Sequence, residues 1–213
     1  MVIGVVTETR NRQDRAAGTR TLILDAAVAC LVELGYAGAS TLAIQAKAGV
    51  SRGRLLHHFP SRDELLVAAS QHLTATRLAQ TEVRVAEQLA DEPEGPRRVE
   101  RCIELLWTTF HEPPFWAAVE LWTAARTNAA LAAALRPEER ALRDAIREVG
   151  DRIWGPAVCA HPNYPELREL LFTSMRGAAL PYTFERRRDP SNDPHVPLWK
   201  SLAHRLLFAD GQC

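Results

Sequence analysis

Apolar positions recur at helical spacing soon after the start of the chain. From Ile23 onward, the positions i, i+3, i+4, i+7, i+8 and i+11 are all apolar, and Gly35 follows where a helix-ending glycine is favoured. This pattern predicts an amphipathic helix. Residues 1–18 show no such periodicity and are predicted to form a flexible arm.

Two short helices are predicted directly afterwards. Ser40 and Thr41 offer N-cap hydroxyls for the first, Gly49 ends it, and Ser51 caps a second that runs to about His58. Two short helices joined by a tight turn that contains glycine are typical of a helix-turn-helix.

The rest of the chain also has helical patterns. Ser61 and Glu64 have the spacing of a capping box, which predicts a long helix that ends near Ala90. Further helices are predicted over residues 97–110, 115–127, 129–153 (which Pro137 could interrupt), 165–180 and 196–208. No segment has the pattern of a strand, so the predicted fold is all-α.

The second helix of the predicted helix-turn-helix has two different sides. Leu55 and Phe59 fall on one side, which predicts that they face the core. The opposite side holds Arg52, Gly53, Arg54, His57 and His58. Charged helix positions are usually only solvated, but the outer face of this particular helix enters the major groove, where arginine can bind guanine or phosphate. We therefore predict that this face binds DNA.

Charge is distributed unevenly along the chain. The formal net charge is zero, yet residues 1–62 hold eight Lys or Arg against four Asp or Glu, and the remainder holds 18 against 22. A basic front end on an acidic body is the expected electrostatic footprint of a polyanion-binding head. With 46% hydrophobic residues, 24% charged residues and no apolar run of membrane-spanning length, the protein is expected to be soluble, without a membrane partner.

Signatures of a metal site or an enzyme are not found in the sequence. The four cysteines are far apart and have no metal-ligand spacing with histidine, so neither a metal nor a cofactor is predicted. Nucleophile-elbow, phosphate-loop and dinucleotide fingerprints are not found, which argues against an enzyme. The N-terminus does not match a signal peptide, and the expected location is the cytoplasm.

The motif resembles a known family. The run from Thr41 to Leu65, T-L-A-I-Q-A-K-A-G-V-S-R-G-R-L-L-H-H-F-P-S-R-D-E-L, preceded by Gly35-Tyr36, looks like the DNA-binding head of the TetR family of bacterial transcriptional regulators. The matching positions are Thr41, Ile44, Ala48, Gly49, Val50, Ser51, Gly53, Leu55, Phe59, Ser61, Glu64 and Leu65. The resemblance implies an N-terminal three-helix head over residues 19–64 and a helical ligand-binding and dimerisation domain over 65–213, after the arm at 1–18.

The resemblance and the outer face of the second helix together give a set of expected DNA contacts. They are Thr41, Gln45, Ser51, Arg52, Gly53, Arg54, His57, His58 and Arg62. Gln45 stands where the family commonly has alanine, and Leu56 where it commonly has a tyrosine that contacts phosphate. Because that tyrosine is missing, the expected contacts to the DNA backbone shift to His57, His58 and Arg62.

The body of the chain is expected to bind a ligand and a second copy of the protein. The segments 165–180 and 196–208 are apolar on more than one face, which fits a four-helix interface in a homodimer. The aromatic residues could form an ordinary core, or they could line the ligand cavity that the family implies. The candidate ligand contacts are Trp107, Phe110, His111, Phe115, Trp116, Trp122, Phe172, Met175 and Arg176.

These observations favour a homodimeric transcriptional regulator. The resemblance favours a repressor over an activator, and the repressor is expected to be released from a palindromic double-stranded DNA operator by a small apolar or aromatic molecule. Two alternatives stay open: a DNA-binding regulator whose body binds a protein partner, and an enzyme with an unrecognised site.

Overall fold

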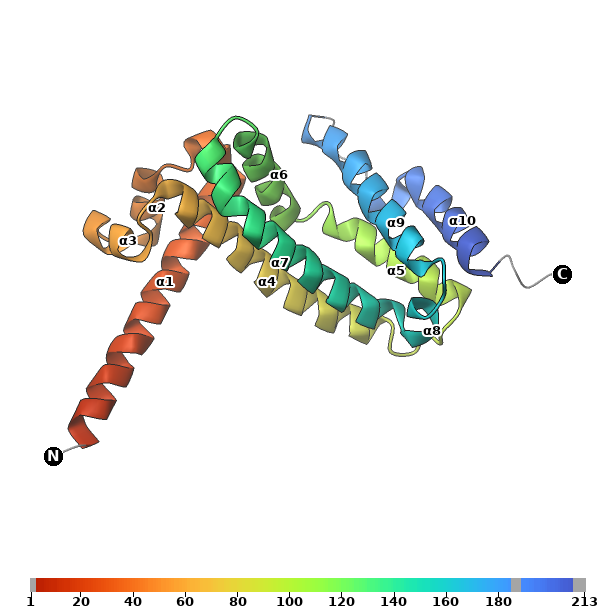
Figure 1. The fold of residues 1–213 in the computed structure, drawn as a ribbon, viewed down its shortest axis with the longest axis horizontal. Helices are drawn as coiled ribbons and strands as arrows, with labels where there is room; N and C mark the ends of the chain where they lie inside the picture. The colour runs from red at the N-terminus through yellow and green to blue at the C-terminus, as the bar shows by residue number, and fades with distance from the viewer. Residues whose placement is uncertain (1–2, 185–188, 209–213) are drawn as a thin grey trace. The chain divides into compact units, whose positions relative to one another are not determined.

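The structure, a computed structural model, describes residues 3–184 and 189–208, and these residues form helices and connecting loops without a strand (Figure 1). The predicted all-α fold is confirmed. The elements are α1 (Ile3–Gly38), α2 (Thr41–Ala48), α3 (Arg52–His58), α4 (Arg62–Gln88), α5 (Pro96–Thr109), α6 (Pro113–Ala125), α7 (Ala129–Trp154), α8 (Pro156–Cys159), α9 (Tyr164–Ala179), the short 3-10 turns η1 (Leu180–Thr183) and η2 (Pro190–Asn192), and α10 (His195–Phe208).

The chain divides into two compact units. The first comprises the residues up to Thr76 together with Ala117–Leu142, and the second comprises Arg77–Trp116 and the residues from Arg143 onward. The head expected over residues 19–64 lies inside the first unit, which also takes in the first part of α4, most of α6 and the first part of α7. The division into a head and a body over 65–213 stays a proposal about function.

Helix α1 is longer than its apolar stripe predicts. It begins at Ile3, so that the described part of the segment expected as a flexible arm is helical. The sequence of this segment contains no proline and has several good helix formers, which is enough for a helix that hydrophobic periodicity does not reveal. By length and composition, Ala17–Gly38 could also cross a membrane, but Ile23, Leu24 and Leu31 of this segment belong to the core of the first unit.

Local capping sets the boundaries of the short helices as predicted. The Ser40 hydroxyl accepts the N–H of Ala43 at 3.1 Å, and the Ser51 hydroxyl accepts the N–H of Arg54 at 3.3 Å. Gly49 ends α2 in a left-handed conformation, with φ of 64°. Thr41, considered as a cap, is instead the first residue of α2.

Ser61 caps α4 as the capping-box spacing predicts, although the Glu64 carboxylate accepts the Ser61 hydroxyl and not its backbone N–H. The Ser61 hydroxyl donates to the Glu64 carboxylate at 3.0 Å and accepts the N–H of Glu64 at 3.2 Å. Leu55 and Phe59 are 1% and 4% exposed and pack in the core of the first unit, as their side of α3 predicts.

Arg62, the first residue of α4, joins the start of this helix to the end of α1. Its Nε donates to the carbonyl oxygen of Ala39 at 2.9 Å, and its Nη2 donates to the carbonyl oxygen of Tyr36. The guanidinium also lies 4.2 Å from the centroid of the Tyr36 ring. Because the last carbonyls of a helix lack partners within the helix and carry partial negative charge, a cation stabilises them. Arg62 therefore caps α1.

Further hydrogen bonds extend from Tyr36 to α6 and α7. The Tyr36 hydroxyl donates to Oδ1 of Asp63 at 2.7 Å, and Nδ2 of Asn128 donates to Oδ2 of the same carboxylate at 2.9 Å. Oδ1 of Asn128 accepts the N–H of Leu131 at 3.1 Å, which caps α7, and Glu120 of α6 accepts the backbone N–H of Tyr36 at 2.8 Å. Burial, followed by the bond to Asp63, raises the pKa of Tyr36. We call these five residues, namely Tyr36, Arg62, Asp63, Glu120 and Asn128, the Tyr36 network.

Gly35 makes room for the Tyr36 network. Its φ of 68° and ψ of 178° interrupt the helical conformation of α1, and φ in this region favours glycine. A Cβ at this position would also lie 3.1 Å from Oε2 of Glu120. The glycine that the sequence predicts as a helix end is thus the point where α6 approaches α1.

We expect Arg62→Ala to lower the free energy of unfolding by about 2 kcal/mol, because two carbonyl oxygens at the end of α1 lose a charged donor. Urea denaturation followed by circular dichroism measures this change. Arg126→Ala is the control, since Arg126 is exposed in the same unit. An unchanged denaturation midpoint for Arg62→Ala would show that this capping does not support the fold.

Candidate functional site

Helix α3 presents basic side chains to solvent. Arg52, Gly53, Arg54 and His57 are exposed, whereas Leu55 is buried beneath them. This arrangement follows from the helical period, because residues on one side of α3 pack on α1 and α2 while the others point away. The predicted outward face is therefore present.

The exposed face of α3 has no carboxylate partner among the described residues. Arg52, Arg54, His57 and His58 form no ion pair there, although other basic groups of the first unit do, such as Lys47 with Glu33 at 2.6 Å. The two arginines are therefore unpaired cations, and such groups attract a polyanion. The surface can therefore bind phosphate, and its arginines have the donor geometry for guanine.

The two histidines at the end of α3 lie in a cationic environment. Their ring centroids are 5.5 Å apart in an edge-to-face arrangement. Burial lowers the pKa of His58, and the positive charges of His57, Arg20 and Arg54 lower it further. Arg20 belongs to α1, so the basic surface includes a residue that the sequence pattern does not single out.

The other expected DNA contacts lie around α3. Thr41 and Gln45 are half-buried on α2, and the Thr41 hydroxyl makes no hydrogen bond within the described part of the chain. Ser51 is exposed, and its hydroxyl caps α3. All three belong to the helix-turn-helix itself.

Arg62 does not fit the expected role of a phosphate contact. Its guanidinium donates to the carbonyl oxygens of Tyr36 and Ala39, and Nη1 lies 3.8 Å from the Asp63 carboxylate. A side chain held in this way by helix α1 and by an acid has little freedom to bind a phosphate. Its position at the start of α4 was correctly predicted, but the direction of the side chain depends on tertiary contacts.

The aromatic residues of the second unit pack against one another. The ring of Phe110 lies 5.3 Å from Phe115, 5.4 Å from Phe172 and 6.2 Å from Trp107. The Trp107 ring lies 4.5 Å from His111, and Phe115 lies 5.0 Å from Trp116. Phe115 is 8% exposed, and Trp107 and Met175 are almost fully buried. The aromatic rings that were expected to line a ligand cavity are thus in contact with one another in this structure.

Two of the expected ligand contacts lie apart from this aromatic core. Trp122 belongs to the first unit, where it packs half-buried on the core. Arg176 is exposed on α9. Periodicity places each residue on a helix face, but it does not tell which helices share a core.

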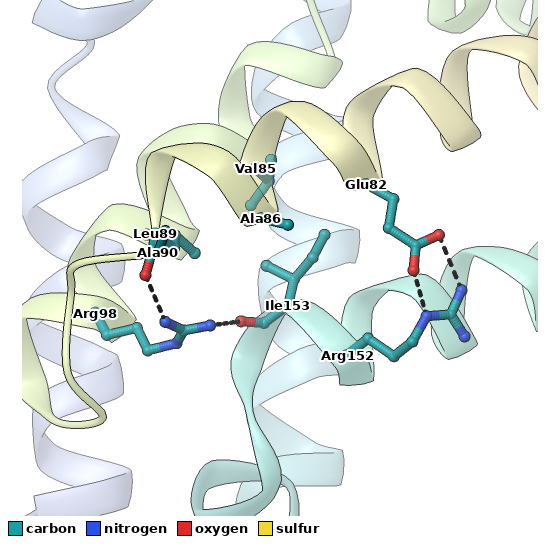
Figure 2. Close-up of a pocket in the computed structure, with 8 residues that line it drawn as sticks. All are labelled: Glu82, Val85, Ala86, Leu89, Ala90, Arg98, Arg152 and Ile153. Atoms are coloured by element: carbon teal, nitrogen blue, oxygen red, sulfur yellow. Dashed lines mark hydrogen bonds and ion pairs between the residues drawn. The ribbon is translucent and has the colours of Figure 1, made fainter.

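A cavity of about 290 Å³ lies elsewhere in the second unit, between the last turns of α4 and α7 (Figure 2). It is lined by Glu82, Val85, Ala86, Leu89, Ala90, Arg98, Arg152 and Ile153. None of the nine expected ligand contacts lines this cavity. Its volume is at the lower end for small-molecule sites.

Charged side chains stand on two sides of the cavity. Arg152 Nη2 donates to the Glu82 carboxylate at 3.0 Å, and this contact with Arg152 lowers the pKa of Glu82. Opposite them, Arg98 donates to the carbonyl oxygens of Leu89 at 3.0 Å and Ile153 at 3.2 Å (Figure 2). The apolar side chains between them give the cavity an amphipathic lining.

The proteins to which this chain is similar are named as transcriptional regulators. The family model described as bacterial regulatory proteins, tetR family, matches residues 23–69. The chain is 24% identical over 180 residues to the HTH-type transcriptional regulator CymR of Pseudomonas putida, covering 84% of this chain and 87% of CymR. It is 26% identical over 171 residues to the uncharacterized HTH-type transcriptional regulator Rv2912c of Mycobacterium tuberculosis, covering 80% of this chain and 86% of the relative.

Solved structures share the fold. The transcriptional regulator FadR from Bacillus subtilis, in complex with stearoyl-CoA, has a TM-score of 0.57 at 16% identity and covers 88% of this chain and 97% of its own. The multidrug binding protein EbrR, complexed with imidazole, has a TM-score of 0.56 at 22% identity and covers 88% and 94%. The helix-turn-helix, its unpaired basic face and the match over residues 23–69 show that this chain carries a DNA-binding domain of the TetR family of bacterial regulatory proteins and is a DNA-binding transcriptional regulator.

Proposed function

We propose that a dimer of this protein represses transcription by binding a palindromic double-stranded DNA operator and releases it when a small molecule binds. The observation that carries the DNA-binding half of this proposal is the exposed basic face of α3, whose arginines lack carboxylate partners among the described residues. The second helix of a helix-turn-helix lies in the major groove, which is where this face would lie. A regulator of bacterial genes acts in the cytoplasm, and the relatives are named as regulators rather than enzymes.

The residues of the helix-turn-helix have different proposed roles. Arg52 and Arg54 are assigned to base edges, because arginine can donate two parallel hydrogen bonds to guanine. Gly53 lies between them, and a Cβ there would meet nothing in the protein, so its small size serves close approach to DNA. Thr41 and Gln45 of α2 are assigned to phosphates, together with Ser51, His57 and His58.

The proposed dimer interface is on α9 and α10. Leu167, Leu171 and Met175 of α9 are buried, but Leu170 on the same helix is 43% exposed. Leu198 of α10 is 64% exposed. Exposed small residues on α9, namely Thr173, Ser174 and Gly177, would let a second helix pack closely. These faces support a symmetric interface between two copies.

The effector is proposed to bind in the second unit. Two structural neighbours, FadR and EbrR, were solved with bound compounds, which supports a ligand response in this chain as well. The cavity of Figure 2 offers room for a small molecule, whereas the aromatic rings pack against one another. We therefore assign the effector to this cavity.

The DNA-binding proposal is tested by Arg52→Ala and Arg54→Ala on an operator selected from a random duplex library. Both variants are expected to lose affinity, and at least one should lose roughly 1–3 kcal/mol of discrimination at one symmetric base pair. Arg126→Ala controls for the loss of one positive charge. If the double variant binds the selected operator as tightly as the wild type, α3 does not read the DNA.

The dimer proposal is tested by Leu198→Glu, which buries a charge if this face forms an interface. Sedimentation equilibrium is expected to show a dimer for the wild type and a monomer for the variant. Val83→Glu is a matched control, because Val83 is 60% exposed on α4. A dimer that tolerates Leu198→Glu would place the interface elsewhere.

The effector site is tested by filling the cavity. In a compound screen, some small molecule is expected to release the operator from the wild type and from Ala75→Phe, which changes an exposed residue of α4 in the first unit. Ala86→Phe should lower the affinity for that compound at least about tenfold, because the ring occupies its space. Equal calorimetric affinity in both variants would remove the effector from this cavity.

A further inference from the structure

Arg20 is brought to the end of α3 by the fold. Its guanidinium lies 5.3 Å from the centroid of the Phe59 ring, where a cation–π interaction holds it. Arg20 is exposed and has no ion-pair partner among the residues that the structure describes. Because Phe59 directly follows α3, this contact places a cation of α1 beside α3, the helix proposed to enter the major groove.

His58 is the neighbour of Arg20 on this surface. Its ring lies 6.4 Å from Phe59, the ring that Arg20 covers, and 5.5 Å from His57. The charged groups that act on His58 are Arg20 from α1 and His57 and Arg54 from α3, all of which can carry positive charge.

The nearest acids in the sequence are engaged elsewhere. On the first turn of α4, Asp63 accepts hydrogen bonds from Tyr36 and Asn128. Glu64 on the same turn accepts the hydroxyl of Ser61. On α2, the cation Lys47 is neutralised by Glu33 of α1. The positive charges around His58 therefore repel one another without compensation, and an anion placed among them would relieve this repulsion.

We propose that Arg20 and His58 together bind a DNA phosphate beside the recognition helix. The proposal rests on the DNA-binding function proposed above and adds Arg20, which lies outside the helix-turn-helix. The guanidinium can donate two parallel hydrogen bonds to phosphate oxygens, and a protonated imidazole can donate one more. Phe59 positions the guanidinium, so that less side-chain freedom is lost on binding.

Binding at this site takes up a proton. Burial and the neighbouring cations hold the pKa of His58 below its usual value in the free protein, so the ring is mostly neutral near pH 7. A bound phosphate favours the charged ring and raises that pKa. The complex then holds more protons than the free protein between the two pKa values, and DNA affinity must rise as pH falls through this window.

Fluorescence anisotropy with a labelled duplex of random sequence tests the proposal, because phosphate contacts do not depend on sequence. The full-length wild type is expected to bind roughly 3- to 30-fold more tightly at about pH 6 than at about pH 8, at constant ionic strength. His58→Gln should flatten this dependence, whereas the control His72→Gln, which removes a histidine of α4 that contacts Asp25 in the same unit, should keep it.

Arg20→Gln should weaken binding roughly 3- to 10-fold and reduce the slope of log affinity against log salt by about 0.9 for each phosphate contact that is lost. Arg136→Gln is the matched control, since it removes an exposed arginine from α7 in the same unit. Urea midpoints confirm that each variant is folded, and Arg20→Lys, which keeps the charge, should bind more tightly than Arg20→Gln.

Either of two results would overturn the proposal that Arg20 and His58 bind a DNA phosphate. One is an unchanged salt slope in Arg20→Gln, and the other is an unchanged pH dependence in His58→Gln. A wild type that binds no duplex at any salt concentration would instead refute the proposed DNA-binding function. The two failures are therefore distinguishable.

Discussion

The capping of α1 by Arg62 is the interaction on which the arrangement of the first unit depends. The two carbonyl oxygens that it binds, those of Tyr36 and Ala39, stand just before the helix-turn-helix. Asp63 and Asn128 extend the same network to the start of α7, and Glu120 extends it to α6. Since α2 and α3 follow directly on the end of α1, the network that fixes this end also fixes the position of the basic face within the unit.

An arginine also binds the carbonyl oxygens of helix ends in the second unit. Arg98, in the first turn of α5, donates to carbonyl oxygens after the end of α4 and at the end of α7, those of Leu89, Glu92 and Ile153. In both units, an arginine near the start of one helix neutralises the partial negative charge at the ends of others. Helix ends buried without such partners would be costly, and one guanidinium supplies donors to several carbonyls at once.

Local signals predicted most of the fold, and tertiary contacts decided the rest. Ser40, Ser51 and the Ser61–Glu64 box act through hydrogen bonds to residues close in sequence, so spacing alone identifies them. Pro137 does not interrupt α7, because it is exposed and the carbonyl it leaves unpaired can bind water. Arg20 and Arg62 contact residues that are far away in the chain, and Trp122 packs on a core formed by distant segments. Their residue types were visible in the sequence, but their partners were not.

The central claim is that the exposed face of α3 touches DNA. Gly53 tests it most directly, because a Cβ added there has no atom of the protein within 4 Å. Gly53→Leu should leave the free energy of unfolding unchanged or raise it by up to about 1 kcal/mol, as leucine favours a helix more than glycine does. The same variant is expected to lose at least about tenfold in operator affinity, since its side chain occupies the space that the DNA takes. A folded Gly53→Leu that binds the operator as tightly as the wild type would contradict the assignment of α3 to the DNA.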